Sequence, residues 1–235
     1  MRSTFSSLLF LLLSLTVGGG AVAHEKEPSP DTIIKTMTER YAAASTYQDV
    51  GVVEITTGAS LPTRSTDVAF KLHFSRPRKL RFEWADLGAL AFFGKTVVWS
   101  DGERTFSHYR TEPGKVEQKE DLGMGIAGAT GVSLGSAATV PSLLLKNIAG
   151  FSPADLERIS LKGQERFEDE DCFVLEGFHP TSEPWRLWVG KRDFLLRKIR
   201  TGLPGGESQE EIHRDIRINE PIPEETFRVK IKKSF

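Results

Sequence analysis

The side chains that could carry catalysis or hold a metal are scattered along this 235-residue chain. The histidines are His24, His73, His108, His179 and His213. They form no HExxH pair, and the single cysteine, Cys172, cannot build a thiolate metal site. A GxSxG match, Gly131–Gly135, lies in a Gly/Ala-rich stretch and follows no strand pattern, so we expect no nucleophile elbow there. We therefore expect no enzymatic activity, no metal and no cofactor.

The individual acidic and nucleophilic residues have ordinary interpretations. The run Glu168–Asp171 is typical of a solvated turn, and His73 falls on the polar side of a strand pattern. Glu54 could oppose a second carboxylate, but the sequence pairs it with none. Cys172 begins the strand pattern CFVLEGF, so we interpret it as a packed thiol in preference to a nucleophile.

The basic residues do not indicate nucleic-acid binding. Arg76, Arg78, Lys79 and Arg81 are close in sequence, but strand alternation divides them between a turn and a wet face. The formal net charge of the chain is only −1, which gives no overall attraction to polyanions. We expect no nucleic-acid partner.

The stretch Val68–Trp84 is the most regular pattern in the sequence. Apolar and polar residues alternate on both sides of Arg76-Pro77-Arg78, as in two strands that each have one dry face. Pro77 cannot donate to a sheet ladder and therefore belongs to the turn. The predicted hairpin carries one apolar face, made of Phe70, Leu72, Phe74, Leu80, Phe82 and Trp84. That face must be covered, either by the protein's own core or by a ligand.

The elements around this hairpin predict a mainly β domain with few helices. An amphipathic helix is expected over Pro30–Ala44, with Asp31 as its cap. Short strands separated by turn-forming residues indicate an antiparallel meander, in which Trp185, Leu187 and Val189 share a face. The predicted strands include Thr96–Trp99, Thr105–Tyr109, Ile159–Phe167, Cys172–Phe178, Pro184–Val189, Leu195–Thr201, Ser208–Ile218 and an edge strand at Phe227–Ile231.

The segment Leu122–Gly150 differs sharply in composition, because it is rich in Gly and Ala and has almost no charge. A short helix is expected over Val140–Ile148, with Pro141 in its first turn. The rest is expected to be loop. Two interpretations remain open: a linker packed on the core, or a mobile apolar cover over a cavity.

The N-terminus has the pattern of a secretory signal. Arg2 precedes the apolar run Leu8–Val17, and Ala21-Val22-Ala23 is a small-residue cleavage site. We expect residues 1–23 to be removed after Ala23, which leaves His24 first and no cysteine there to accept a lipid. Residues 24–235 are then expected to form one soluble, monomeric, periplasmic domain.

Three stretches, FSRPRKLRFEW, VVWSDGERTFSHY and INEPIPEETFRVKI, resemble motifs of the LolA/LolB lipoprotein-localisation family. In that family they correspond to an RP-containing strand, an SDG hairpin and a proline-bearing final segment. The Gly/Ala-rich stretch Leu122–Ala138 differs from the family pattern. The resemblance implies a strongly curved antiparallel sheet that forms an incomplete barrel, closed by an N-terminal helix and a helical or loop lid.

The resemblance also implies a function, namely an outer-membrane lipoprotein carrier whose concave face receives acyl chains of a lipoprotein or lipid. Membrane donor and acceptor proteins would be its partners. A sensor or protein-interaction module of the same fold is the alternative, and a small enzyme is the third. Arg76 matches the family arginine that latches the lid. The expected cavity wall comprises Phe70, Leu72, Phe74, Leu80, Phe82, Trp84, Trp99, Trp185 and Leu187.

Overall fold

The computed structural model describes residues 27–57, 63–87, 96–146, 148, 152–179 and 184–231. The expected signal segment and its cleavage site lie outside these residues. Among the described residues, no helix combines the length and the apolar character that crossing a bilayer requires.

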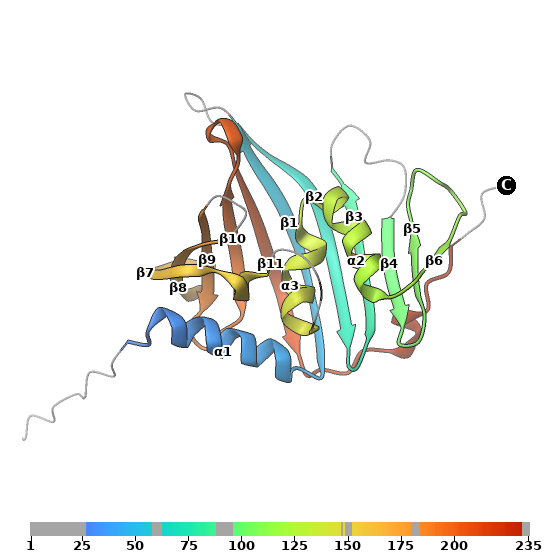
Figure 1. The fold of residues 1–235 in the computed structure, drawn as a ribbon, viewed down its shortest axis with the longest axis horizontal. Coiled ribbons are helices and arrows are strands. Elements are labelled where there is room, and N and C mark those ends of the chain that lie inside the picture. Colours follow the sequence, from blue (N-terminus) through green and yellow to red (C-terminus); the bar gives the residue numbers. More distant parts are fainter. Residues whose placement is uncertain are drawn as a thin grey trace, which may run out of the picture.

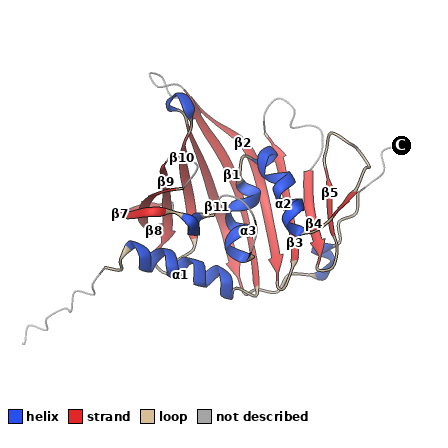
Figure 2. Cartoon of the chain, in the orientation of Figure 1, coloured by secondary structure: helices blue, strands red, loops and turns tan. Residues whose placement is uncertain are grey.

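Eleven strands form one antiparallel sheet among the described residues. Figures 1 and 2 show that the sheet is not closed into a barrel. The strand order is β6-β5-β4-β3-β2-β1-β11-β10-β9-β8-β7, so two meanders join where β1 pairs with β11. The strands are β1 Thr46–Thr57, β2 Thr63–Ser75, β3 Lys79–Asp86, β4 Thr96–Asp101, β5 Thr105–His108, β6 Glu117–Lys119, β7 Glu157–Phe167, β8 Glu170–Phe178, β9 Pro184–Gly190, β10 Leu196–Gly202 and β11 Ser208–Ile218.

The predicted central hairpin is confirmed as β2 and β3. Its register places Phe70 opposite Trp84, Leu72 opposite Phe82 and Phe74 opposite Leu80, so these side chains share one face. The strands expected in the last third of the chain, up to Ile218, are also confirmed within two residues at their ends. Alternation in these segments was a sufficient signal because each strand has one buried face.

The helix α1, Pro30–Ala43, lies close to the predicted bounds, but its cap differs. The hydroxyl of Ser29 accepts a hydrogen bond from the Thr32 N–H, while Asp31 lies in the first turn. Ile33, Ile34, Met37 and Tyr41 are buried, as their spacing predicted. Figure 2 shows all three α-helices on the same side of the sheet.

The Gly/Ala-rich segment is mostly helical, which corrects the expectation of a loop before Val140. We call residues Leu122–Leu144 the cover. It comprises α2 Leu122–Thr130, the 3₁₀ helix η1 Gly131–Ser133 and α3 Ser136–Leu144, with Leu134 and Gly135 between η1 and α3. Asp121 caps α2 by accepting from the Met124 N–H at 2.8 Å. Leu134 and Gly135, with φ of 54° and 91°, separate η1 from α3. Pro141 lies inside α3, not in its first turn.

The C-terminal segment forms no strand among its described residues, which corrects the prediction for Phe227–Ile231. A 3₁₀ helix, η4, spans Glu224–Phe227 instead. Prolines just before it cannot donate to a sheet ladder, and Arg81 of β3 donates to the Thr226 carbonyl at 2.9 Å. The segment thereby covers the outer face of β3 and β4.

Gly51 of β1 is expected to be essential for packing the apolar face. A Cβ at this position would lie 2.1 Å from Phe70 Cζ and 2.4 Å from the Ile212 carbonyl oxygen. Gly51→Ala should therefore lower the free energy of unfolding by about 1–3 kcal/mol through overpacking. Gly131→Ala is the control, because nothing lies within 4 Å of the added Cβ. Equal unfolding midpoints in urea for the two variants would contradict this packing.

Candidate ligand-binding site

The six apolar side chains of the central hairpin lie together in the core beneath the helices. All are at most 5% exposed, and their rings pack in series, with Phe70 5.8 Å from Phe82 and Phe82 5.5 Å from Trp84. Trp185 and Leu187 of β9 belong to the same apolar cluster. The hairpin residues are packed as core, and Trp84 also borders a surface pocket of about 280 Å³.

Trp99 lies on the other face of the sheet from the remaining predicted wall residues. It pairs with Arg81, whereas Val98 pairs with Phe82. Its ring stacks on Phe106 at 5.3 Å, close to the segment that contains η4. The prediction placed it on the wrong face because the alternation in TVVWSD is uninformative when every residue is apolar or small.

Arg76 donates hydrogen bonds to the last turn of α1. Its Nε lies 2.8 Å from the Ala44 carbonyl oxygen, and its Nη2 lies 3.0 Å from that of Tyr41. A cation at a helix C-terminus stabilises the carbonyls that lack intrahelical partners. As a latch of the lid, Arg76 would be expected to bond to a cover such as Leu122–Gly150, but these two carbonyls lie in the last turn and the C-cap of α1. A latch function for Arg76 stays a prediction.

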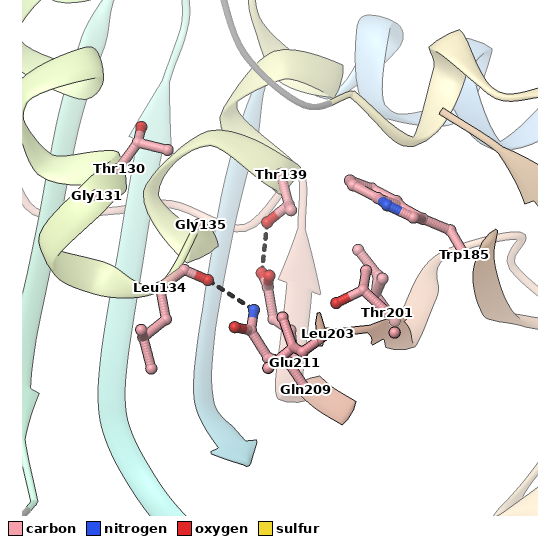
Figure 3. Close-up of a pocket in the computed structure, with 12 residues that line it drawn as sticks. Thr130, Gly131, Leu134, Gly135, Thr139, Trp185, Thr201, Leu203, Gln209 and Glu211 are labelled. Carbon is pink, nitrogen blue, oxygen red and sulfur yellow. Dashed lines mark hydrogen bonds between the residues drawn. The ribbon is translucent and has the colours of Figure 1, made fainter. Parts of the chain in front are cut away.

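A pocket of about 340 Å³ lies between the cover and the strands β9, β10 and β11 (Figure 3). Its apolar walls come from Leu134 of the cover and from Trp185, Ile199 and Leu203 on the sheet side. Thr139, Thr201, Gln209 and Glu211 add polar groups to the same pocket. Trp185 is the predicted wall residue that lines it.

Two hydrogen bonds join the cover to residues of β11 at the floor of this pocket (Figure 3). Gln209 Nε2 donates to the Leu134 carbonyl oxygen at 2.7 Å, and the Thr139 hydroxyl donates to Glu211 Oε1. Leu134 has a left-handed backbone conformation at the end of η1, which leaves its carbonyl directed at β11. These bonds fix the position of α3 on the sheet.

Behind Glu211, a buried ionic cluster continues into the core. His213 Nδ1 lies 2.8 Å from Asp49 Oδ2, and its Nε2 lies 3.2 Å from Glu211 Oε1. The Tyr47 hydroxyl donates to Asp49 Oδ2 at 2.8 Å. All four side chains are almost completely buried. Each imidazole nitrogen faces a carboxylate, so no ring lone pair is left to ligate a metal or accept a proton.

The pKa of His213 is raised by these carboxylates. Burial acts to lower the pKa, but the hydrogen bonds to Asp49 and Glu211 outweigh burial and raise the pKa from 6.5 to about 9. At neutral pH the ring is therefore an imidazolium. By contrast, burial raises the pKa of the Cys172 thiol to about 11, which agrees with the prediction of a packed, unreactive side chain.

The polar residues of this site were missed by sequence reasoning. Gln209, Glu211 and His213 occur at every second position of a predicted strand, and Tyr47 and Asp49 do so in β1. That spacing places each set on one face. The signal was available, but alternation alone cannot tell a buried polar face from a solvated one.

Comparisons with known proteins give no family assignment. No family model matches the chain, and no curated protein matches it. Among solved structures, a LolA superfamily protein from Nitrosomonas europaea is similar at 12% identity, covering 86% of this chain and 98% of that one, with a TM-score of 0.37. The Mycobacterium tuberculosis lipoprotein LppX is similar at 11% identity, covering 82% of this chain and 96% of that one, with a TM-score of 0.48.

The complex of Pseudomonas aeruginosa MucA and MucB contains a third similar chain, at 12% identity and a TM-score of 0.48. The match covers 86% of this chain and 61% of that one. A LolA superfamily protein is thus among the neighbours.

The stability of the protein should depend on pH through His213. Because the pKa of His213 is about 9 in the folded protein and 6.5 is its ordinary value, its stabilising contribution is complete below pH 6.5 and is lost as pH rises through 9. The free energy of unfolding should fall by on the order of 3 kcal/mol across this window. Urea titrations at several pH values measure this slope. His213→Gln should abolish it, and identical slopes in both proteins would contradict the assignment.

Proposed function

We propose that this protein binds the apolar chain of an amphiphilic ligand between the cover and the sheet, and acts as a periplasmic carrier for an acylated lipoprotein or lipid. The observation that carries the proposal is the pocket of about 340 Å³ with mostly apolar walls beneath the cover. This volume falls in the range of small-molecule sites, which combine apolar walls with a few convergent polar groups. The export pattern of residues 1–23 supports the expected location.

The energetics favour entry of an acyl chain. Burying a methylene group yields about 0.8 kcal/mol, while a hydrogen bond contributes about 0.5–1.5 kcal/mol net. A few methylenes therefore offset the two bonds from β11 that hold the cover. Displacing the cover would extend the pocket toward Phe70, Phe82 and Trp84, which lie in the same apolar cluster as Trp185. We propose that these residues form the floor of the open site.

In this proposal, Arg76 holds the C-terminal end of α1 in place. Its two bonds tie the end of α1 to the turn between β2 and β3. Leu143 and Leu144 of α3 belong to the same buried cluster as Met37 of α1, so the position of α1 limits how far the cover can move. We propose that Arg76 acts on the cover indirectly, through α1.

Binding is proposed in preference to catalysis because the described polar groups at the pocket include no hydroxyl paired with a neutral imidazole. The His213 imidazolium cannot accept a proton, and the Thr139 hydroxyl donates its hydrogen bond to Glu211. A serine-type mechanism needs a neutral imidazole beside the nucleophile. The protein-interaction module remains the competing function, and it does not require an occupied pocket.

Filling the pocket should abolish binding without unfolding the protein. Leu203→Trp adds a large side chain at the pocket wall and should lower the affinity for a fluorescent acyl probe at least tenfold. Met124→Trp is the matched control, because Met124 is 56% exposed on α2 and does not line this pocket. Thermal melts establish that both variants fold. Equal probe affinity in wild type, Leu203→Trp and Met124→Trp would sink the proposal and favour an interaction module.

A further inference from the structure

The pocket beneath the cover has a charge that the protein does not balance. Its lining contains the carboxylate of Glu211 but no lysine or arginine. Glu211 is 3% exposed, so water solvates its charge poorly. The neighbouring cluster adds one more carboxylate, Asp49, and one imidazolium, His213, which leaves one excess negative charge in this buried region.

Glu211 also has unused hydrogen-bonding capacity. Its Oε1 accepts a hydrogen bond from the Thr139 hydroxyl and lies 3.2 Å from His213 Nε2 as an ion pair. No hydrogen bond to its Oε2 is found among the described residues, although an ionised carboxylate accepts at both oxygens. The two basic residues that flank Ile199 on the adjacent strand have other partners: Lys198 lies over the ring of Trp188 at 3.8 Å, and Arg200 donates to the Ser208 hydroxyl at 3.4 Å. Trp188 belongs to a different buried cluster from Trp185, on the opposite face of the sheet.

We infer that the pocket selects an amphiphile whose polar end carries an N–H donor, an amide or an ammonium group, which binds Glu211 while the apolar chain lies along Trp185, Ile199 and Leu203. This inference rests on the proposed function and specifies its ligand. A fatty acid is disfavoured, because its carboxylate would meet Glu211 at close range in a region of low dielectric. Thr201 and Gln209 border the same polar region of the pocket and add hydrogen-bonding groups around the head.

The test compares ligands of one chain length that differ only in the head group. Dodecylamine, N-dodecylacetamide and lauric acid are titrated against the folded full-length protein, with displacement of a neutral fluorescent probe as the readout. Dodecylamine, the amide or both should bind at least tenfold tighter than lauric acid. Tight binding of the amine alone identifies an ammonium ligand, whereas tight binding of the amide identifies an N-acylated ligand such as an acylated peptide.

Glu211→Gln should reduce the preference for dodecylamine over lauric acid at least tenfold. Glu210→Gln is the matched control for overall charge, because Glu210 is the neighbouring residue, pairs with Arg64 and does not line the pocket. Glu211→Asp keeps the charge and should therefore keep most of the preference. An unchanged preference in folded Glu211→Gln, a lost preference in folded Glu211→Asp, or equal affinity of the wild type for all three ligands would overturn the inference. If the neutral probe itself does not bind the wild type, the proposed function fails as well.

Discussion

The rest of this structure depends on the hydrogen bonds and ion pairs of a row of polar side chains that lies in the middle of an apolar surface. Gln209, Glu211 and His213 lie on β11, which pairs with β1 where the two meanders join. Burying charged groups is costly unless they are paired and hydrogen-bonded. Two of these side chains obtain partners from the cover, Leu134 and Thr139, so the same bonds that satisfy the row also position the cover.

The cover itself depends on this packing, because its sequence is a weak helix former in isolation. Glycine in a helix interior is destabilising, and short helices in water are marginal without tertiary contacts. Packing explains why residue 125 is a glycine, because a Cβ there would lie 2.8 Å from Thr105 Cγ2 and 3.1 Å from Val98 Cγ1. The small residues therefore allow α2 to approach β4 and β5 closely. A segment held by close contacts and two hydrogen bonds is suited to open as a unit.

The sequence was informative about the sheet for a physical reason that does not extend to the cover. Strands such as β2 and β3 have one dry face, and alternation records it directly in Phe70, Leu72 and Phe74. The cover has no such period, because its Ala and Gly residues are small enough to be buried on several sides. The partners of Arg76 were likewise unpredictable, since Ala44 and Tyr41 contribute backbone carbonyls that carry no sequence signal.

The residues of the ligand site could be predicted from the sequence only to the same extent. Trp185 was identified because it and Leu187 occupy alternate positions of β9 and therefore share a face. Trp99 was placed on the wrong face because its strand has no apolar–polar alternation. Glu211 and His213 were not singled out as a pair, because a polar residue on a strand ordinarily faces solvent. Their burial follows from the cover and from the pairing of β11 with β1, both of which are long-range features.

Native-state hydrogen exchange of the backbone amides tests most directly whether the polar row of β11 holds a separately opening cover. The account predicts that amides of α3 exchange through an opening of lower free energy than amides of β1 and β11. It also predicts that Thr139→Val, which removes the donor to Glu211, accelerates exchange in the cover and leaves exchange in the sheet unchanged. Exchange of the cover and the sheet at one common rate, in wild type and variant alike, would contradict the account.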